Sequence, residues 1–178
     1  MNQFVSRPLD DTLSLDNFSC GNDILDGWLQ HEARRAQHAG VARVTVWAPA
    51  DTPNRVVAFY CVSPTQIVTQ QTILPRSASA GYSIVPAWLM GRLAVDTGYQ
   101  GIGIGTQLMV DAVETVVSLA TRGGGRLILV DPIDDATDSW YRRLGFAPFT
   151  PPAATRQSRL FMRIDRALDS LATAQPLN

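Results

Sequence analysis

Lysine is absent from this 178-residue chain, so all 15 of its basic side chains are arginines. They oppose 16 acidic residues, of which only Glu32 and Glu114 are glutamates, and the formal net charge is −1. This near balance excludes a basic tail and a generally cationic surface that would bind any polyanion. A GC-rich coding bias is the simplest explanation for the missing lysines. It leaves arginine, which binds phosphate through a planar bidentate fork, as the only long cation.

Cysteine and histidine are scarce, and long hydrophobic runs are missing. Cys20 and Cys61 are the only cysteines, and no basic segment followed by an apolar one opens the chain, so we expect reduced thiols in a cytoplasmic protein. No run reaches the ~18 apolar residues of a membrane span, and no membrane partner is expected. The only histidines, His31 and His38, would lie roughly 10 Å apart along one helix. They cannot share a metal ion, so no metal site is predicted.

The composition is that of a folded domain. Hydrophobic residues make up 46% of the chain and charged residues 17%, which is enough apolar content to bury one core. No repeat, linker or shift in composition divides the sequence, so residues 1–178 are expected to form a single domain. An early hairpin followed by strand-helix-strand units predicts the α/β class with a mixed sheet.

Apolar periodicity predicts the individual elements. Asn22 can cap a helix that ends at Gly40. Its apolar face is predicted to hold Ile24, Leu25, Trp28, Leu29, Ala33 and Ala36. Residues 42–48 alternate and 56–62 are apolar throughout, so they are expected to pair as a hairpin. Residues 63–86, apart from 66–68, are expected to be loops with room for one short helix or strand. The other expected elements are strands over 4–7, 88–95, 127–130 and 159–164, and helices over 103–120, 134–144 and 165–172.

The strongest chemical signal is a glycine-rich turn between a predicted strand and a predicted helix. The strand ends Arg92-Leu93-Ala94-Val95-Asp96, and the turn reads Gln100-Gly101-Ile102-Gly103-Ile104-Gly105. Backbone N–H groups and a helix N-terminus converge there, which favours an anion and in particular a pyrophosphate.

Three nucleotide-binding motifs can be excluded on their residues. The phosphate loop of NTPases needs a lysine, which this chain lacks. Gly101, Gly103 and Gly105 are spaced by two throughout, which misses the G-x-G-x-x-G dinucleotide fingerprint. Kinase motifs are absent. What remains is the Q/R-x-x-G-x-G/A motif of acetyl-CoA-dependent acetyltransferases, matched at Gln100, Gly103 and Gly105.

With these residues the sequence resembles the GNAT superfamily, and within it the acetyltransferase toxins of bacterial type II toxin–antitoxin modules. The resemblance runs through 18–22, 25–29, 91–96 and 100–105 to Trp140-Tyr141-Arg142-Arg143-Leu144-Gly145-Phe146. It implies the GNAT acyl-CoA N-acyltransferase fold, a central mixed β-sheet flanked by helices, with acetyl-CoA as cosubstrate and no metal.

The resemblance also implies roles for residues. Tyr141 would protonate the departing thiolate, because a phenol with a pKa near ~10 stays protonated at neutral pH. The alternative is that Tyr141 is only a partly buried neighbour of core residues. Backbone groups of Leu93, Ala94 and Val95 would pair with the pantetheine arm. The pyrophosphate would be held by Gln100, Gly101, Ile102, Gly103, Ile104, Gly105 and Thr106.

No general base is evident, since Asp96 and Asp131 could serve as turn or cap residues. A lysine amine (pKa ~10.4) must lose a proton before attack, whereas an α-amine (pKa ~7.8) is already substantially neutral. The missing base therefore fits the toxin branch's substrate, the α-amine of aminoacyl-tRNA, whose acetylation stops translation. Neither cysteine is placed as a nucleophile, so direct attack is expected.

A tRNA substrate requires cations at its phosphates. The candidates are Arg34, Arg35, Arg76, Arg92, Arg142 and Arg143, with Arg156 and Arg159 near the last strand. The resemblance further implies a homodimer and a ribbon-helix-helix antitoxin, with operator DNA bound only by the toxin–antitoxin complex. Two alternatives stay open: an N-acetyltransferase of a small amine, antibiotic or protein N-terminus, and a non-catalytic acyl-CoA-binding regulatory domain. The sequence does not select one aminoacyl-tRNA.

Overall fold

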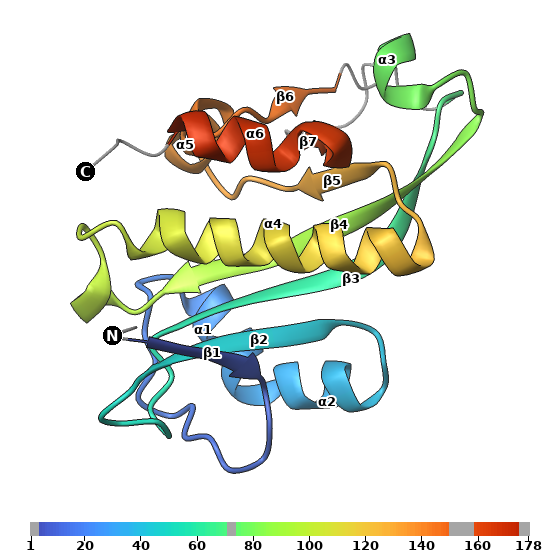
Figure 1. Ribbon diagram of the computed structural model, residues 1–178. Helices are drawn as coiled ribbons and strands as arrows, with labels where there is room; N and C mark the ends of the chain where they lie inside the picture. Colours follow the sequence, from blue (N-terminus) through green and yellow to red (C-terminus); the bar gives the residue numbers. More distant parts are fainter. Residues whose placement is uncertain (1–3, 71–73, 150–158, 175–178) are drawn as a thin grey trace. The chain divides into compact units, whose positions relative to one another are not determined.

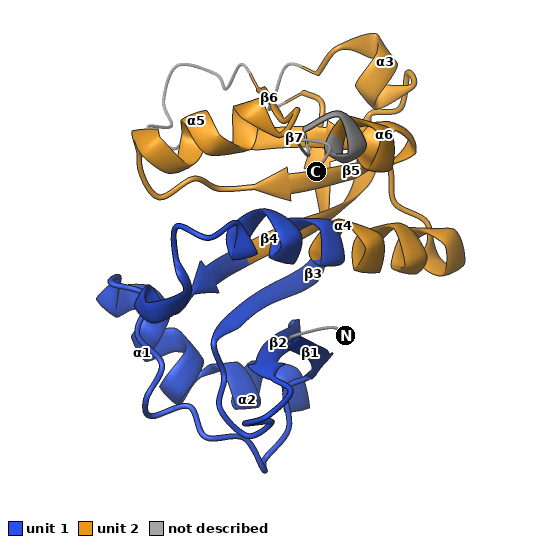
Figure 2. Ribbon diagram, turned by 60° about the vertical axis from the view of Figure 1, so that its left-hand side comes forward, with its two compact units in different colours: residues 1–63, 92–111 blue, residues 64–91, 112–178 orange. Residues whose placement is uncertain are grey.

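The computed structural model describes residues 4–70, 74–149 and 159–174. Within these ranges seven strands form one mixed sheet in the order β1-β2-β3-β4-β5-β7-β6 (Figure 1). The chain forms two compact units, Met1–Ser63 with Arg92–Asp111, and Pro64–Gly91 with Ala112–Asn178 (Figure 2). The central strands β3 (Ala58–Val68) and β4 (Ile84–Val95) each contribute residues to both units. The single domain expected from the sequence stays a prediction.

The first unit contains the predicted hairpin. β2 (Arg43–Pro49) pairs antiparallel with β3, with Val46 opposite Phe59, and β1 (Phe4–Pro8) pairs antiparallel with β2. β3 begins at Ala58 and runs on through 63–65, which were expected to be loop, to Val68 at the end of the segment 66–68 that was set apart from the loops. Alternation of polar and apolar residues is weak there, so the extension has little local signal.

The predicted first helix is split in two. α1 (Asp23–His31) begins where the Asn22 side chain accepts hydrogen bonds from Ile24 N and Leu25 N, as predicted. α2 (Ala33–His38) follows a break at Glu32. Leu29 and Ala33 are fully buried, but Ile24 is 79% exposed, so its placement on the apolar face was wrong. It lies about 100° of helical rotation before Leu25, off the edge of the buried stripe.

The second unit is built on the buried strand β5 (Leu127–Val130), whose bounds are those predicted. It pairs in parallel with β4, from Ala87↔Leu127 to Met90↔Val130, and antiparallel with β7 (Leu160–Arg163). The two-residue β6 (Ala147–Pro148) pairs with β7 and was not predicted. A short helix, α3 (Arg76–Ser79), lies in 63–86, the region where one short helix or strand was allowed among loops.

Three longer helices follow the predicted positions closely. They are α4 (Ile104–Gly123), α5 (Asp135–Arg143) and α6 (Ile164–Ala174). The Asp134 side chain caps α5 by accepting Thr137 N at 2.7 Å, and Gly145 follows it with φ +98°. The apolar face of α4 is buried at Leu108, Met109, Ala112, Val113 and Val116.

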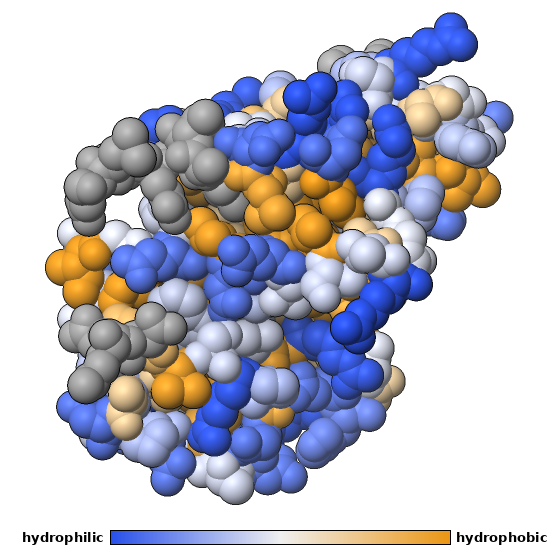
Figure 3. Space-filling view, in the orientation of Figure 1, coloured by the Kyte–Doolittle hydropathy of each residue, from blue (hydrophilic) through white to orange (hydrophobic). Residues whose placement is uncertain are grey.

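Each unit has its own apolar core. In the first, Leu29 and Ala33 pack with Val44, Phe59 and Ala94. In the second, residues of β4, β5 and β7 pack with Phe149. Large apolar side chains also reach the surface, where Figure 3 shows hydrophobic residues interspersed with hydrophilic ones. Among the described residues, no helix has both the length and the apolar character needed to span a membrane.

Candidate active site

The glycine-rich turn links β4 to α4 in the first unit. Asp96, which is 5% exposed, caps the short helix η1 (Thr97–Tyr99) by accepting Gly98 N at 2.9 Å. Gly101 and Gly103 then take φ angles of +76° and +86°. No heavy atom lies within 4 Å of a Cβ placed on either glycine, so the backbone conformation rather than crowding requires glycine here.

The turn presents a row of unpaired donors. From Gly101 to Thr106, no backbone N–H has a hydrogen-bond acceptor among the described residues, and the first bond is Gln107 N to Gly103 O at 3.3 Å. Four of these N–H groups are unpaired because a helix cannot pair its own first donors. With the dipole of the 20-residue α4 behind them, these groups can bind an anion.

The side chain of Gln100 points into the protein rather than toward the free donors. Its Nε2 donates to Val95 O at 2.8 Å and to Cys20 O at 3.0 Å. The side chain of Gln100 therefore stabilises the start of the turn, and the groups available to an anion are the backbone N–H groups of 101–106. Sequence reasoning missed this link because Cys20 is distant in the chain.

The residues predicted to meet the pantetheine arm lie at the end of β4. β4 runs on to Val95, beyond Met90, the last of its residues in register with β5. Ala94 and Val95 have buried side chains, with exposures of 6% and 8%. Because these side chains are used in packing, the groups that Leu93 to Val95 can offer to a ligand are backbone N–H and C=O.

Tyr141 lies in α5 of the second unit and is 6% exposed. Its ring contacts those of Trp140 and Phe146, with centroids 4.9 and 5.5 Å away. Burial, and secondly the nearby Asp131 carboxylate, raise the pKa of Tyr141 above its ordinary value. Among the described residues its hydroxyl has no hydrogen-bond acceptor. The group is thus a protonated donor at neutral pH.

Neither aspartate considered in the sequence is a free base. Asp96 accepts Gly98 N through Oδ1 and Ser19 N through Oδ2, the latter at 3.3 Å. Asp131 forms a bidentate ion pair with Arg159, at 2.6 and 2.7 Å. Both carboxylates therefore have structural partners. Because Arg159 is paired with Asp131, its guanidinium is not available to a phosphate in this arrangement.

The arginines predicted to meet tRNA differ in what they contact. Arg34 donates to Leu13 O at 2.6 Å and Asp10 O at 3.4 Å, so it holds the chain that precedes α1. Arg35 pairs with Glu32 at 3.3 Å on the surface.

Arg92 has its guanidinium carbon 4.2 Å from the Trp28 ring centroid. Such a cation–π contact fixes a guanidinium without neutralising its charge.

The two neighbouring arginines of α5 also differ. Arg142 is paired with Asp138, one helical turn before it. Arg143 is exposed, as is Arg76 in α3, and neither has an acidic partner among the described residues. Arg156 lies outside the described residues. Of the eight predicted cations, Arg143 and Arg76 are thus both exposed and without an acidic partner among the described residues.

Thiol and metal chemistry find no site among the described residues. Burial, with a further contribution from Asp26, raises the pKa of the Cys20 thiol to about 11, so a reactive thiolate is not formed at neutral pH. Cys61 is buried. Across the described ranges, no group of three or more His, Cys, Asp or Glu residues could hold a metal ion.

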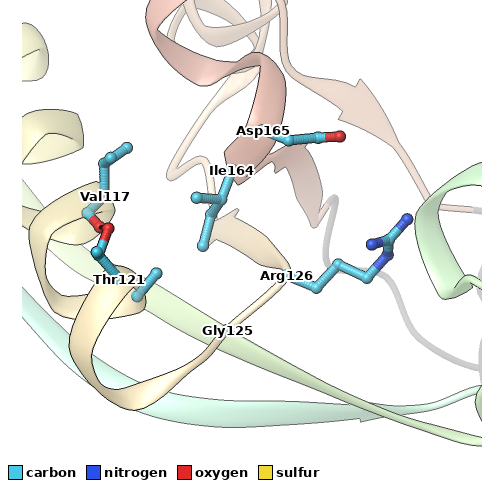
Figure 4. Close-up of a pocket in the computed structure, with 7 residues that line it drawn as sticks. Val117, Thr121, Gly125, Arg126, Ile164 and Asp165 are labelled. Carbon is cyan, nitrogen blue, oxygen red and sulfur yellow. Dashed lines mark hydrogen bonds between the residues drawn. The ribbon is translucent and has the colours of Figure 1, made fainter.

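A separate pocket of about 250 Å³ lies in the second unit, between α4, the start of β5 and α6 (Figure 4). Val117, Thr121 and Ile164 give it partly apolar walls. The Arg126 side chain extends away from the other lining residues and donates to Ala78 O and Ser77 O of α3 at 2.6 and 2.7 Å. Because the Arg126 guanidinium is bonded to these two carbonyls, it is not available to a ligand in this pocket.

Comparison with known proteins identifies proteins of similar sequence. The model of the "Acetyltransferase (GNAT) domain" matches residues 42–148. A tRNA-acetylating toxin of Mycobacterium tuberculosis (strain ATCC 25618 / H37Rv) is 31% identical over 162 residues, covering 91% of this chain and 94% of that protein. A probable toxin TacT of Sinorhizobium fredii (strain NBRC 101917 / NGR234) is 26% identical over 141 residues, covering 74% and 76%.

Solved structures show the same fold. AtaT complexed with acetyl-methionyl-tRNAfMet has a TM-score of 0.81 at 22% identity, covering 91% of this chain and 95% of that one. A KacT mutant with a tyrosine replaced by phenylalanine has a TM-score of 0.81 at 20% identity, covering 98% and 100%. AtaTR bound with AcCoA has a TM-score of 0.77 at 23% identity, covering 97% and 98%. The mixed sheet with flanking helices expected from the sequence is confirmed.

Proposed function

The chain belongs to the GNAT acetyltransferase family, and from this premise we propose that it transfers acetyl from acetyl-CoA to the α-amino group of an aminoacyl-tRNA. An acetylated α-amine cannot form the next peptide bond, so the reaction stops translation and the protein acts as a toxin. The observation that carries the proposal is the row of unpaired N–H groups from Gly101 to Thr106 at the start of α4. It lies in a chain 31% identical to a tRNA-acetylating toxin.

The residues present fit acetyl-CoA. The free donors at 101–106 suit its pyrophosphate, and the backbone of Leu93 to Val95 suits the amide groups of its pantetheine arm. When bound, acetyl-CoA supplies the acetyl thioester. Gln100 and Asp96 keep the turn in place through their own hydrogen bonds. No metal is required for this chemistry.

Tyr141 is the proposed general acid. Its raised pKa keeps the phenol protonated through the neutral range, and the hydroxyl is not committed to another described residue. In this role Tyr141 donates its proton to the sulfur that leaves as the amide bond forms, and the proton lost by the attacking nitrogen returns to the phenolate through water.

The α-amine needs no carboxylate base in this scheme. Asp96 and Asp131 are both engaged, in a turn and in an ion pair. An aminoacyl ester has an amine whose pKa lies below the ~7.8 of a free α-amine, so the attacking nitrogen is largely neutral at physiological pH. Attack on the thioester is direct, and a covalent enzyme intermediate is not involved.

The tRNA phosphates are assigned to exposed arginines. Arg143 lies two positions after Tyr141 in α5, and Arg76 lies in α3. Both lack an acidic partner among the described residues. Arg92 adds a charge that Trp28 holds in place. Binding of this kind weakens steeply with salt because bound counterions are released.

The proposed partners are inferred from related structures. Related structures include AtaT bound to the C-terminus of the antitoxin AtaR and a KacTA–DNA complex. We therefore extend the proposal to a ribbon-helix-helix antitoxin that neutralises the enzyme, to operator DNA bound only by the complex, and to a homodimer. A charged-tRNA substrate places the enzyme in the cytoplasm.

The test is incubation with acetyl-CoA and total charged tRNA, followed by mass spectrometry of the released aminoacyl-adenosine. An added acetyl group on one or a few aminoacyl-adenosines supports the proposal and identifies the amino acid. Acetylation of free amines or protein N-termini with charged tRNA unchanged would favour the first alternative. Binding of acetyl-CoA without turnover on any amine would favour the regulatory domain.

A further inference from the structure

In the first unit, the segment Ser19–Cys20 is hydrogen-bonded to the start of the acetyl-CoA turn. Gln100 Nε2 donates to Cys20 O at 3.0 Å, and Thr97 N donates to Ser19 O at 2.8 Å. In the other direction, Ser19 N donates to Asp96 Oδ2 at 3.3 Å. Three bonds thus join two stretches that are separated by most of the first unit's sequence.

The same segment is held from its other side by helix α1. Asp26, in the first turn of α1, accepts Cys20 N through Oδ1 at 2.8 Å and Ser19 Oγ through Oδ2 at 3.1 Å. Hydrogen bonds to an ionised carboxylate are stronger than bonds between neutral groups. Asp26 therefore fixes Ser19 and Cys20, and these two residues fix the residues that lead into the turn.

The turn itself has little other support. Gly101 and Gly103 are exposed, and no heavy atom lies within 4 Å of a Cβ built on either one. Glycines in such a setting have wide conformational freedom, which must be restricted before their N–H groups can bind an anion together. The described restraint lies just before them, at Asp96, Thr97 and Gln100.

We propose that Asp26 and Gln100 are positioning residues that hold the turn ready for acetyl-CoA and couple it to helix α1. The proposal rests on the proposed function in one respect, that the turn binds the pyrophosphate of acetyl-CoA. Asp26 acts through Ser19 and Cys20 and does not touch the ligand. Gln100 contributes its side-chain amide to two carbonyls, and the N–H groups after it bind the pyrophosphate.

Because α1 and the turn are linked through Ser19 and Cys20, a partner that binds α1 can change the affinity of the turn for acetyl-CoA. The first turn of α1 exposes Ile24, which is 79% accessible, and it also carries Asp26. A protein partner that packs on Ile24 and displaces this turn would also displace Ser19 and Cys20, and would so alter the affinity for acetyl-CoA. By thermodynamic linkage, acetyl-CoA would change the partner's affinity by the same factor.

The test measures coenzyme A and acetyl-CoA binding by calorimetry, which needs no acetyl acceptor. Gln100→Met removes the amide at nearly equal volume, and Asp26→Asn weakens the carboxylate's acceptor role. Each change is expected to raise Kd about tenfold, the effect of losing one or two hydrogen bonds. The double variant should show less than the sum of the two effects, because both act through Cys20.

The matched control is Gln37→Met. Gln37 lies in α2 of the same unit, where its side-chain amide donates to Leu9 O and accepts from Val44 N at 2.7 Å, with no hydrogen bond to Ser19, Cys20 or the turn among the described residues. It should leave Kd within about twofold of wild type. Equal losses in Gln37→Met and Asp26→Asn, or no loss in either test variant, would overturn the proposal. A purely structural role would lower thermal stability and leave Kd unchanged.

Kinetics of the variant and hydrogen exchange of the wild-type protein supply two further readouts. For Asp26→Asn, KM for acetyl-CoA should rise about tenfold while kcat at saturation stays within about twofold. In the wild-type protein, coenzyme A should slow amide exchange at Ser19, Cys20 and Thr97. Unchanged exchange at all three would contradict the coupling. A wild-type protein that binds no coenzyme A would instead contradict the proposed function.

Discussion

The ring of Tyr141 meets that of Phe146 edge to face, with centroids 5.5 Å apart and an interplanar angle of 68°. This contact, with that to Trp140, orients a phenol whose hydroxyl has no hydrogen-bond acceptor among the described residues. The ring is therefore held by packing, and the hydroxyl is free for the proposed proton transfer. Removing the oxygen while keeping the ring separates these two functions.

Tyr141→Phe is expected to lower kcat by about 10²-fold or more, the usual effect of losing a general acid. The phenyl ring keeps its contacts with Trp140 and Phe146, so the free energy of unfolding should not fall and the Kd for acetyl-CoA should not rise. Single-turnover acetylation of charged tRNA, with calorimetry as the binding control, measures both. A variant with full activity would remove Tyr141 from the mechanism.

The pKa of Tyr141 also predicts how stability depends on pH. Burial first, and Asp131 second, raise this pKa above its ordinary value of 10.0. Below pH 10 both the folded and the unfolded protein keep the proton, so the contribution of Tyr141 is fully present. Above pH 10 the unfolded chain loses it and the folded protein does not, so stability falls as pH rises.

Urea unfolding of wild type and Tyr141→Phe at pH 8 and pH 11 checks this sign. The difference between the two proteins should shift by about 1 kcal/mol against wild type over that interval. Parallel losses in both proteins would show that Tyr141 titrates normally. Because the raised pKa keeps the phenol of the folded protein protonated, titration of Tyr141 should cause no loss of kcat below pH 10.

Arg34 is expected to support the fold rather than tRNA. Its guanidinium donates to two backbone carbonyls, Leu13 O and Asp10 O, and Arg34→Met leaves both without that donor. Loss of such charge-assisted bonds costs about 2 kcal/mol. Chemical denaturation should show this loss, while the affinity for tRNA stays near that of wild type at temperatures where the variant is folded. A tRNA-binding defect without a stability loss would reverse the assignment.

Arg143 is expected to behave in the opposite way. It is exposed and lacks an acidic partner among the described residues, so Arg143→Met should leave stability unchanged and weaken tRNA binding. The slope of log K against log salt should fall by about 0.7–0.9, the share of one phosphate contact. Arg122→Met, which removes an exposed arginine at the end of α4, is the control and should leave the slope unchanged.

Gly103→Ala tests the backbone of the turn. Gly103 has φ +86° with open space around its Cβ position, so the added methyl meets no atom and acts only through the dihedral angle. Holding alanine there costs roughly 1–2 kcal/mol, which should raise the Kd for acetyl-CoA roughly tenfold. Gly27→Ala, a helical glycine with equally open space, should leave this Kd unchanged.

Local chemistry in the sequence determined much of this protein. Asn22 caps its helix as predicted, the fully apolar Leu127–Val130 is a buried strand, and the glycines at 101 and 103 mark a turn with positive φ angles. These signals act over a few residues, so they can be read without knowing what the rest of the chain contacts. The break of the first helix at Glu32 and the exposure of Ile24 were missed because they depend on what packs against that helix.

Tertiary structure decided the partners of the polar side chains. Gln100 finds the carbonyl of Cys20, Arg159 occupies Asp131, and Arg34 binds carbonyls that precede α1. An arginine or glutamine has the same donors wherever it lies. Whether these donors meet a carbonyl, a carboxylate or solvent depends on which distant segments the fold brings beside them. The sequence by itself therefore determined where an anion could bind, and the fold decided which side chains shape that site and which stay free.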